Sequence, residues 1–351
     1  MASQMTDCIV TYRGDIVENR HMVHAAIVDA NGKLRYAVGD PFRVTLPRSA
    51  AKPAQALAIL ETGALDKFSF DDKDLALMCA SHNSEDRHLS RARAMLATIH
   101  AEETDLRCGG HAALSEPVNK TWIKADYTPT AICNNCSGKH AGMIAGAKAL
   151  GADIASYHMP ENAMQSRVRR VIEDLSGLDE HGVKWGIDGC NLPTPALPLN
   201  SLAQLYSTFA TAADEVESNI DLSKRTENLA RVFRAMSQSP ELVGGEGRFC
   251  TRLMAAYQGG LIGKIGAEGC YGIGVRKAIQ HGADTAIGIA IKIEDGNKPI
   301  LYSAIMEILE QLNIGTQEIR EKLADLHHPK LLNTAGVEIG KVSCSIKVRA
   351  V

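Results

Sequence analysis

Residues 22–38 read MVHAAIVDANGKLRYAV, and this stretch decides which fold to expect. Two runs that favour extended structure, Met22–Val28 and Leu34–Val38, flank the turn Asp29–Gly32. An Asn-Gly pair between two such runs is a strong signal for a β-hairpin. The preceding run, Ile9–Tyr12, has the same character, so the chain is predicted to open with an antiparallel sheet.

Strand-like sequence returns towards the C-terminus. Thr285–Ile293 favours a strand, and Val342–Val348 alternates apolar and polar residues as a half-buried strand does. Between the two ends the apolar residues recur mainly at helical spacing. The predicted helices include Ala54–Glu61, Arg87–His100, Ser166–Leu175 and Ser201–Ala213.

These patterns predict an α/β (α+β) fold. Residues 1–48 and 246–351 are expected to form a discontinuous sheet lobe, and residues 49–245 an inserted, mainly helical lobe. A site between the two lobes is the expected place for chemistry.

Composition argues against several classes of function. The 351 residues carry 38 basic and 41 acidic side chains, a formal net charge of −3, and only 5% aromatic residues, which argues against a nucleic-acid partner. No apolar run is long enough to span a membrane, and no secretory signal is visible. We therefore expect a soluble, cytoplasmic protein.

The cysteines indicate the same compartment. There are nine, and an odd number spread over a long chain does not suggest a disulfide framework. We expect free thiols, some of them metal ligands.

The hexapeptide Arg48-Ser49-Ala50-Ala51-Lys52-Pro53 is the first candidate catalytic motif. In one helical turn, a Ser-x-x-Lys spacing places the hydroxyl and the amine on the same face. The amine can take the serine proton if burial or another cation lowers its pKa. The alternative is that Ser49 caps a helix and Lys52 lies on the surface.

Two further short motifs favour the catalytic interpretation. Ser81-His82-Asn83 follows an apolar run, and Lys264-Ile265-Gly266 precedes a glycine-rich, strand-like stretch. Ser-x-x-Lys, Ser-x-Asn and Lys-x-Gly, in this order, resemble the three catalytic elements of serine β-lactamases and penicillin-binding proteins. The interpretation gives two serine–lysine pairs for acyl transfer, Ser49 with Lys52 and Ser81 with Lys264.

A third group of residues suggests a metal. Cys133-Asn-Asn-Cys136-Ser-Gly-Lys139-His140 is followed by Asp188-Gly189-Cys190. Cys136 and Lys139 would share a helix face, and Asp188 and Cys190 a strand face. Two thiolates and one nitrogen would leave a fourth zinc position open. Cys133 and Cys136 could instead pair as a zinc knuckle, or the cysteines could be small buried residues.

Other signals have simpler explanations. Gly244–Cys250 is glycine-rich but has no phosphate-binding pattern, so a loop near the cleft is expected. His327-His328 precedes a proline and suits a solvated turn. Cys8, Cys79 and Cys344 are expected in the core.

Together these motifs resemble the rhizobial-type (class 3) L-asparaginases. The resemblance covers essentially the whole chain, including Cys79-Ala-Ser81-His82 and Gly245-Glu246-Gly247-Arg248. It implies a serine β-lactamase-like fold, a homodimer, and hydrolysis of L-asparagine to L-aspartate and ammonia.

The resemblance also implies roles for particular residues. The catalytic tandems fall on Ser49/Lys52 and Ser81/Lys264. The zinc (Zn2+) ligands fall on Cys136, Lys139 and Cys190, with Asp188 beside the metal. The remaining candidates for supporting or substrate-binding roles are Arg48, His140 and Cys250. Arg48 is a candidate for the substrate α-carboxylate by position alone.

Amide hydrolysis needs a nucleophile, a base, an acid for the leaving nitrogen and stabilisation of an oxyanion. We expect Ser49 to attack with Lys52 as base, while Ser81 and Lys264 relay a proton to the leaving nitrogen. Zinc is expected to orient the substrate, and Lys139 would bind it as the neutral amine. Two alternatives remain open: a β-lactamase-like or peptidase-like serine hydrolase, and a non-catalytic, zinc-stabilised amino-acid-binding protein.

Overall fold

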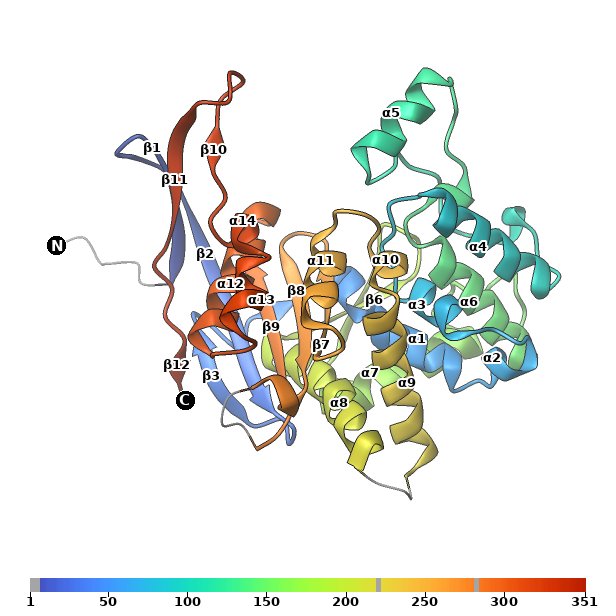
Figure 1. The fold of residues 1–351 in the computed structure, drawn as a ribbon. Helices are drawn as coiled ribbons and strands as arrows, with labels where there is room; N and C mark the ends of the chain where they lie inside the picture. The colour runs from blue at the N-terminus through green and yellow to red at the C-terminus, as the bar shows by residue number, and fades with distance from the viewer. Residues whose placement is uncertain (1–6, 219–221, 281–283) are drawn as a thin grey trace.

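The computed structural model describes residues 7–218, 222–280 and 284–351, so the first six residues of the predicted sheet lobe lie outside the described residues. The large antiparallel sheet lies towards the left of the view together with the C-terminal helices, and most of the other helices lie to its right (Figure 1). The strands of the large sheet are β1 (Cys8–Arg13), β2 (Ile16–Asp29), β3 (Leu34–Val38), β7 (Leu261–Gly266), β8 (Cys270–Val275), β9 (Ile287–Ile293), β10 (Leu331–Leu332), β11 (Glu338–Cys344) and β12 (Arg349–Ala350).

The long strand β2 joins the two chain ends into this one sheet. Its first half pairs with β1 and its second half pairs with both β3 and β9. In the strand order β10-β11-β1-β2-β9-β8-β7, the N-terminal strands β1 and β2 therefore lie between two groups of C-terminal strands. The predicted hairpin is confirmed, with Asp29 N–H donating to Lys33 at 3.0 Å across the turn.

Glycines in the central strands bring helix α8 (Leu199–Ser218) close to the sheet. A Cβ added to Gly288 would lie 1.8 Å from the carbonyl oxygen of Ala203, and one added to Gly272 would lie 2.0 Å from the Tyr206 ring. Only glycine leaves room for the helix backbone and the tyrosine here. The stretch after the Lys-x-Gly motif, which forms β8, is glycine-rich because α8 packs against it.

Helices α11 (Phe249–Tyr257) and α12 (Lys298–Gln311) cover the opposite face. Successive strand residues point to opposite faces of a sheet. Tyr271, next to Gly272, accordingly contacts Phe249 of α11, which stacks on Tyr302 of α12 at 4.3 Å between ring centroids.

The inserted region is helical, with one small sheet. Its described α-helices, besides α8, are α1 (Lys52–Leu60), α2 (Ala64–Lys67), α3 (Asp72–Met78), α4 (Asp86–Thr98), α5 (Glu116–Lys124), α6 (Ser137–Ala149), α7 (Ala163–Ser176), α9 (Lys224–Gln238) and α10 (Pro240–Val243). Two further short helices, α13 (Gln317–Glu321) and α14 (Ala324–His327), lie in the C-terminal part of the chain. The small sheet has the order β4 (Val44–Thr45), β6 (Pro193–Pro198) and β5 (Lys184–Ile187).

The predicted α/β fold class is confirmed: an antiparallel sheet from both chain ends carries an inserted helical region. The C-terminal strand is shifted, since β11 ends at Cys344 and the chain leaves the sheet before Val348. None of the described helices is long and apolar enough to cross a membrane.

Two segments project from the body. One carries β1, β10 and β11, and the other carries α5, which stands away from the remaining helices (Figure 1). No side chain of α5 is buried.

Candidate active site

Ser81 lies between two buried amines. The Nζ atoms of Lys52 and Lys264 lie 3.0 Å and 2.8 Å from Ser81 Oγ, and all three residues are at most 4% exposed. Lys52 also donates to the carbonyl of Ala80, and Lys264 to that of Ile265 at 2.7 Å. The serine and both amines are therefore held in one continuous hydrogen-bonded chain.

Three elements bring this chain together. Lys52 is the first residue of α1, and Lys264 lies in the middle of β7. Ser81 lies in the segment that follows α3, where its N–H donates to the carbonyl of Val243 at 3.0 Å. The site thus forms where the sheet meets the helical region.

Gly266 makes the close approach of β7 possible. A Cβ at this position would lie 2.1 Å from the carbonyl oxygen of Pro47, which immediately precedes the Arg48–Ala51 turn. The glycine of the Lys-x-Gly motif thus lets the strand carrying Lys264 pack against the turn carrying Ser49.

Ser49 lies in the turn that packs against β7. It belongs to a short 3-10 turn, η1 (Arg48–Ala51), and is half-buried. Within the described residues its hydroxyl has no hydrogen-bond partner and caps no helix. Lys52 is fully buried. The alternative of a helix cap followed by a surface lysine is therefore wrong, and the Ser49 hydroxyl is free to meet a substrate.

The electrostatics of the site favour a neutral Lys264. Burial lowers the pKa of Lys264 to about 7, and the nearby cations Lys52 and Arg248 act in the same direction. Near neutral pH this amine is present in both forms, so it can accept and return a proton.

Two thiols and a second lysine adjoin the serine–lysine chain. Cys136 Sγ lies 3.0 Å from Lys52 Nζ, and Cys190 Sγ lies 3.2 Å from Lys139 Nζ. A hydrogen bond from Cys136 lowers the pKa of Cys190 well below its ordinary value. That bond and burial raise the pKa of Cys136 to about 12. Cys190 is thus the thiolate of the pair.

Lys139 balances that thiolate. Burial opposes its charge, but the charges of Cys190, Cys136 and Asp188 outweigh burial and raise the pKa of Lys139. Three buried donor atoms, two sulfurs and an amine, therefore lie together. Cysteine sulfur is a ligand that zinc prefers, and a neutral amine can add a nitrogen ligand. The donor set fits a zinc ion, with Lys139 giving up its proton when the metal binds.

Asp188 connects this group to Ser49. Its carboxylate accepts from Arg48 Nε at 2.5 Å, and Arg48 has a left-handed backbone, with φ of +52°. Burial opposes the charge of Asp188, but Lys139 and Arg48 still lower its pKa. The expected strand position was wrong, because β5 ends at Ile187 and Asp188 and Cys190 lie in the following turn.

The other two predicted residues lie behind the site. His140 is fully buried, with Nδ1 2.6 Å from the Tyr157 hydroxyl. Cys250 Sγ accepts from the Ile265 N–H at 3.3 Å and from the Tyr271 hydroxyl at 3.2 Å, which places it beside the strand of Lys264. None of the nine cysteines, all of which lie in the described residues, forms a disulfide.

Comparison with known proteins identifies the family of this chain. The sequence profile of the L-asparaginase II family matches residues 9–344. The chain belongs to the L-asparaginase II family. No curated protein matches the sequence.

Solved structures show a more distant similarity. Mglu in its native form in 4.3 M NaCl is 12% identical, with a TM-score of 0.43 over 84% of this chain and 62% of the Mglu chain. A second native Mglu structure is 13% identical, with a TM-score of 0.43 over 84% of this chain and 65% of the other. The chain thus spans less than two thirds of the length of these Mglu chains.

Sequence reasoning missed one part of the site of this L-asparaginase II family member. The Asn83 Oδ1 atom accepts from Arg248 Nη1 at 2.9 Å, and its amide nitrogen donates to Glu246 O at 3.1 Å. The Gly244–Cys250 loop is therefore fixed to the segment carrying Ser81. The position of Asn83, only two residues after Ser81, was the sequence feature that could have indicated its place in the site.

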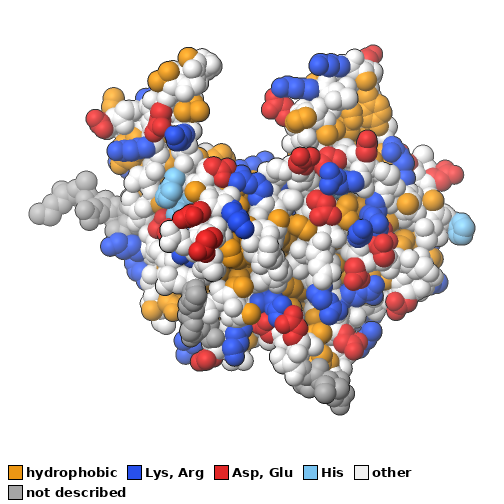
Figure 2. Space-filling view, viewed as in Figure 1, with side chains coloured by type: hydrophobic (Ala, Val, Ile, Leu, Met, Phe, Trp, Pro, Cys, Tyr) orange, Lys and Arg blue, Asp and Glu red, His pale blue; other side chains and the backbone are white. Residues whose placement is uncertain are grey.

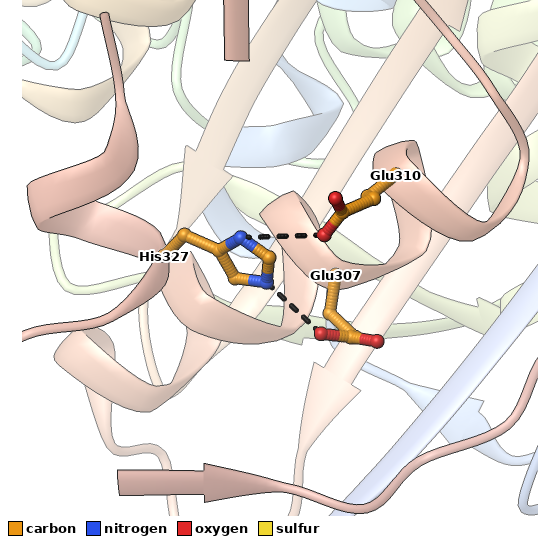
Figure 3. Close-up of side chains that lie close together, drawn as sticks. All are labelled: Glu307, Glu310 and His327. Carbon is orange, nitrogen blue, oxygen red and sulfur yellow. Dashed lines mark hydrogen bonds and ion pairs between the residues drawn. The ribbon is translucent and has the colours of Figure 1, made fainter. Parts of the chain in front are cut away.

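The prediction of a solvated turn at His327-His328 was wrong for His327. It is 6% exposed, lies at the end of α14 and has Nε2 2.9 Å from Glu307 and Nδ1 3.7 Å from Glu310 (Figure 3). The three side chains could hold a metal ion, but the imidazole already pairs with both carboxylates. They link α14 to α12, away from Ser81.

Proposed function

We propose that this protein hydrolyses the side-chain amide of L-asparagine, giving L-aspartate and ammonia. Membership of the L-asparaginase II family supports the reaction. The observation that carries the proposal is the continuous chain from Lys52 through Ser81 to Lys264, whose strand β7 packs against the turn that carries the half-buried Ser49.

We assign the attack to Ser49. A bond forms between its Oγ and the amide carbon, and its proton passes to Lys52, which must be neutral to accept it. Lys52 contacts Ser81, so the proton can move through the Ser81 hydroxyl to the leaving nitrogen. Lys264 holds the hydroxyl from the other side and exchanges protons with it near neutral pH.

The second half of the reaction reverses the transfers. Cleavage of the carbon–nitrogen bond releases ammonia and leaves an ester on Ser49. Water attacks the ester carbon and gives a proton to the amine that accepted the first one. The amine passes this proton to Ser49 Oγ as the bond between Oγ and the acyl carbon breaks, which releases L-aspartate and restores the serine. The same two lysines therefore serve acylation and deacylation.

We propose zinc as the metal of this site, held by Cys136, Lys139 and Cys190 with Asp188 beside it. When bound, the ion would supply a positive charge that orients the polar groups of the substrate. Cys136 also contacts Lys52, so a change in the position of this metal ligand is expected to change the position of the base as well.

The decisive experiment measures ammonia release from L-asparagine and L-glutamine, with and without chelator and added zinc. We expect turnover of asparagine, a loss of about 10³-fold or more in Ser49→Ala, and an acyl-enzyme adduct on the Ser49 peptide. In Ser81→Ala, the adduct should still form on Ser49, but more slowly. An adduct on Ser81, or full activity of Ser49→Ala, would overturn the nucleophile assignment.

Two controls separate the alternatives. Hydrolysis of nitrocefin without ammonia release from asparagine would identify a β-lactamase-like enzyme. A Cys136→Ser, Cys190→Ser double variant tests the metal. It should lose bound zinc by elemental analysis, and full activity without metal would remove zinc from the reaction.

A further inference from the structure

We propose that Arg248 is the receptor for the substrate's α-carboxylate and thereby sets the specificity of the site. This inference rests on the proposed asparaginase function and names the group that recognises the amino-acid end of the substrate. Arg248 directly precedes α11 and is half-buried, at the end of the glycine-rich loop that starts at Gly244.

The loop is built to hold Arg248 in place. Gly245 has φ of +109°, and a Cβ there would lie 2.5 Å from the Asn83 amide nitrogen. Any other residue would push the loop away from Asn83. The Asn83 side chain is 2% exposed and bonds to Arg248, Glu246 and Glu85, at 2.9, 3.1 and 3.0 Å. Arg248 is thus fixed to Asn83, which lies two residues along the chain from Ser81.

The charge of Arg248 is uncompensated. Its hydrogen-bond partner is a neutral amide, and in residues 7–218, 222–280 and 284–351 no carboxylate lies within ion-pair distance of it. The positive charge of Arg248 acts on the pKa values of Lys264, His82 and Tyr302, and the nearby Glu85 carboxylate is bonded to Asn83. An anion bound here would relieve this local excess of positive charge.

Arg48, the other candidate, is less suited to bind a carboxylate. Asp188 already neutralises it through a contact of 2.5 Å. Arg248 uses one nitrogen for Asn83, and its remaining N–H groups are in a planar fork that suits two carboxylate oxygens. A substrate carboxylate is therefore expected to bind Arg248 in preference to Arg48.

The test compares substrates with and without that carboxylate. L-asparagine and succinamate both carry it, whereas 3-aminopropanamide lacks it. Measured at pH 8.5, above the titration of Lys264, Arg248→Gln should lower kcat/KM for the first two by about 30- to 100-fold, mainly through KM. The loss for 3-aminopropanamide should be much smaller, and Arg248→Lys should recover part of the difference.

Arg48→Gln is the matched control and should leave the preference for carboxylate-bearing substrates in place. Equal losses on all three substrates, or a loss of preference in Arg48→Gln but not in Arg248→Gln, would overturn the inference.

A binding measurement keeps this test separate from the proposed function. Calorimetry with L-aspartate should show binding to the wild-type protein, weakened by about 30-fold or more in Arg248→Gln. Inactive wild-type protein that still binds aspartate through Arg248 would refute the hydrolysis alone. If Arg248→Gln binds aspartate as tightly as wild type, or if wild type does not bind it, the carboxylate site is refuted.

Discussion

At the scale of single residues, Lys264 sets the pH range of the site. Burial lowers its pKa to about 7, so below pH 7 Lys264 is mainly protonated and can no longer accept a proton from Ser81. We expect kcat/KM for asparagine to rise with pH through about 7, with a slope of one on a logarithmic scale. A profile that is flat from pH 6 to 8 would contradict this role.

Lys264→Met should separate activity from stability. We expect a loss of activity of about 10³-fold, together with a gain of about 2 kcal/mol in the free energy of unfolding at pH 7. The sign follows from the pKa. It lies near 7 in the folded protein and near 10.5 in the unfolded chain, so the unfolded chain binds more protons between these values. Wild-type stability should therefore rise from pH 7 to 9, and the variant should lose this slope.

Lys292→Met is the matched control. Lys292 is also a buried lysine on a central strand, but it donates to the carbonyl of Ile293 and is not in contact with Ser81. The activity profile of this variant should keep its rise near pH 7. Chemical denaturation at several pH values measures both effects.

At the scale of elements, the contact between α8 and the sheet depends on strand glycines. Gly288→Ala should destabilise the protein by about 3 kcal/mol, because its Cβ would collide with the helix backbone at Ala203. Gly109→Ala should change the free energy of unfolding by less than about 0.5 kcal/mol, since nothing lies within 4 Å of the added atom. Similar losses in both variants would show that the close approach of α8 is unimportant.

The attachment of α14 to α12 gives a pH-dependent prediction. The hydrogen bond with His327 lowers the pKa of Glu307, so this carboxylate stabilises the fold above its unfolded pKa, near 4.5. The contribution disappears as the pH falls through the folded value. Glu307→Gln should cost about 1 kcal/mol at pH 7 and progressively less below pH 4.5. A loss that does not change with pH would point to packing instead.

At the scale of the whole molecule, features that depend on neighbouring residues could be predicted from the sequence, whereas contacts between distant residues mostly could not. The hairpin after β2 could be predicted because its signal lies within a few neighbouring residues. Ser81 and Lys264, 183 positions apart, could be paired only through the order of motifs. The bond between Asn83 and Arg248 spans 165 positions and depends on how β7 and α11 pack, which no local pattern encodes.

The arm that carries α5 is where we expect a second copy of the chain to bind. Ile123 is 70% exposed, Leu114 42% and Tyr127 39%, and hydrophobic side chains gather on this projection (Figure 2). Burying such an apolar surface would stabilise the homodimer that we propose. Light scattering should show a dimer for wild type and a monomer for Ile123→Asp, while Ile16→Asp, on the β1–β2 projection, should remain dimeric. A monomeric wild type would refute the dimer, and dissociation only in Ile16→Asp would place the interface at the other projection.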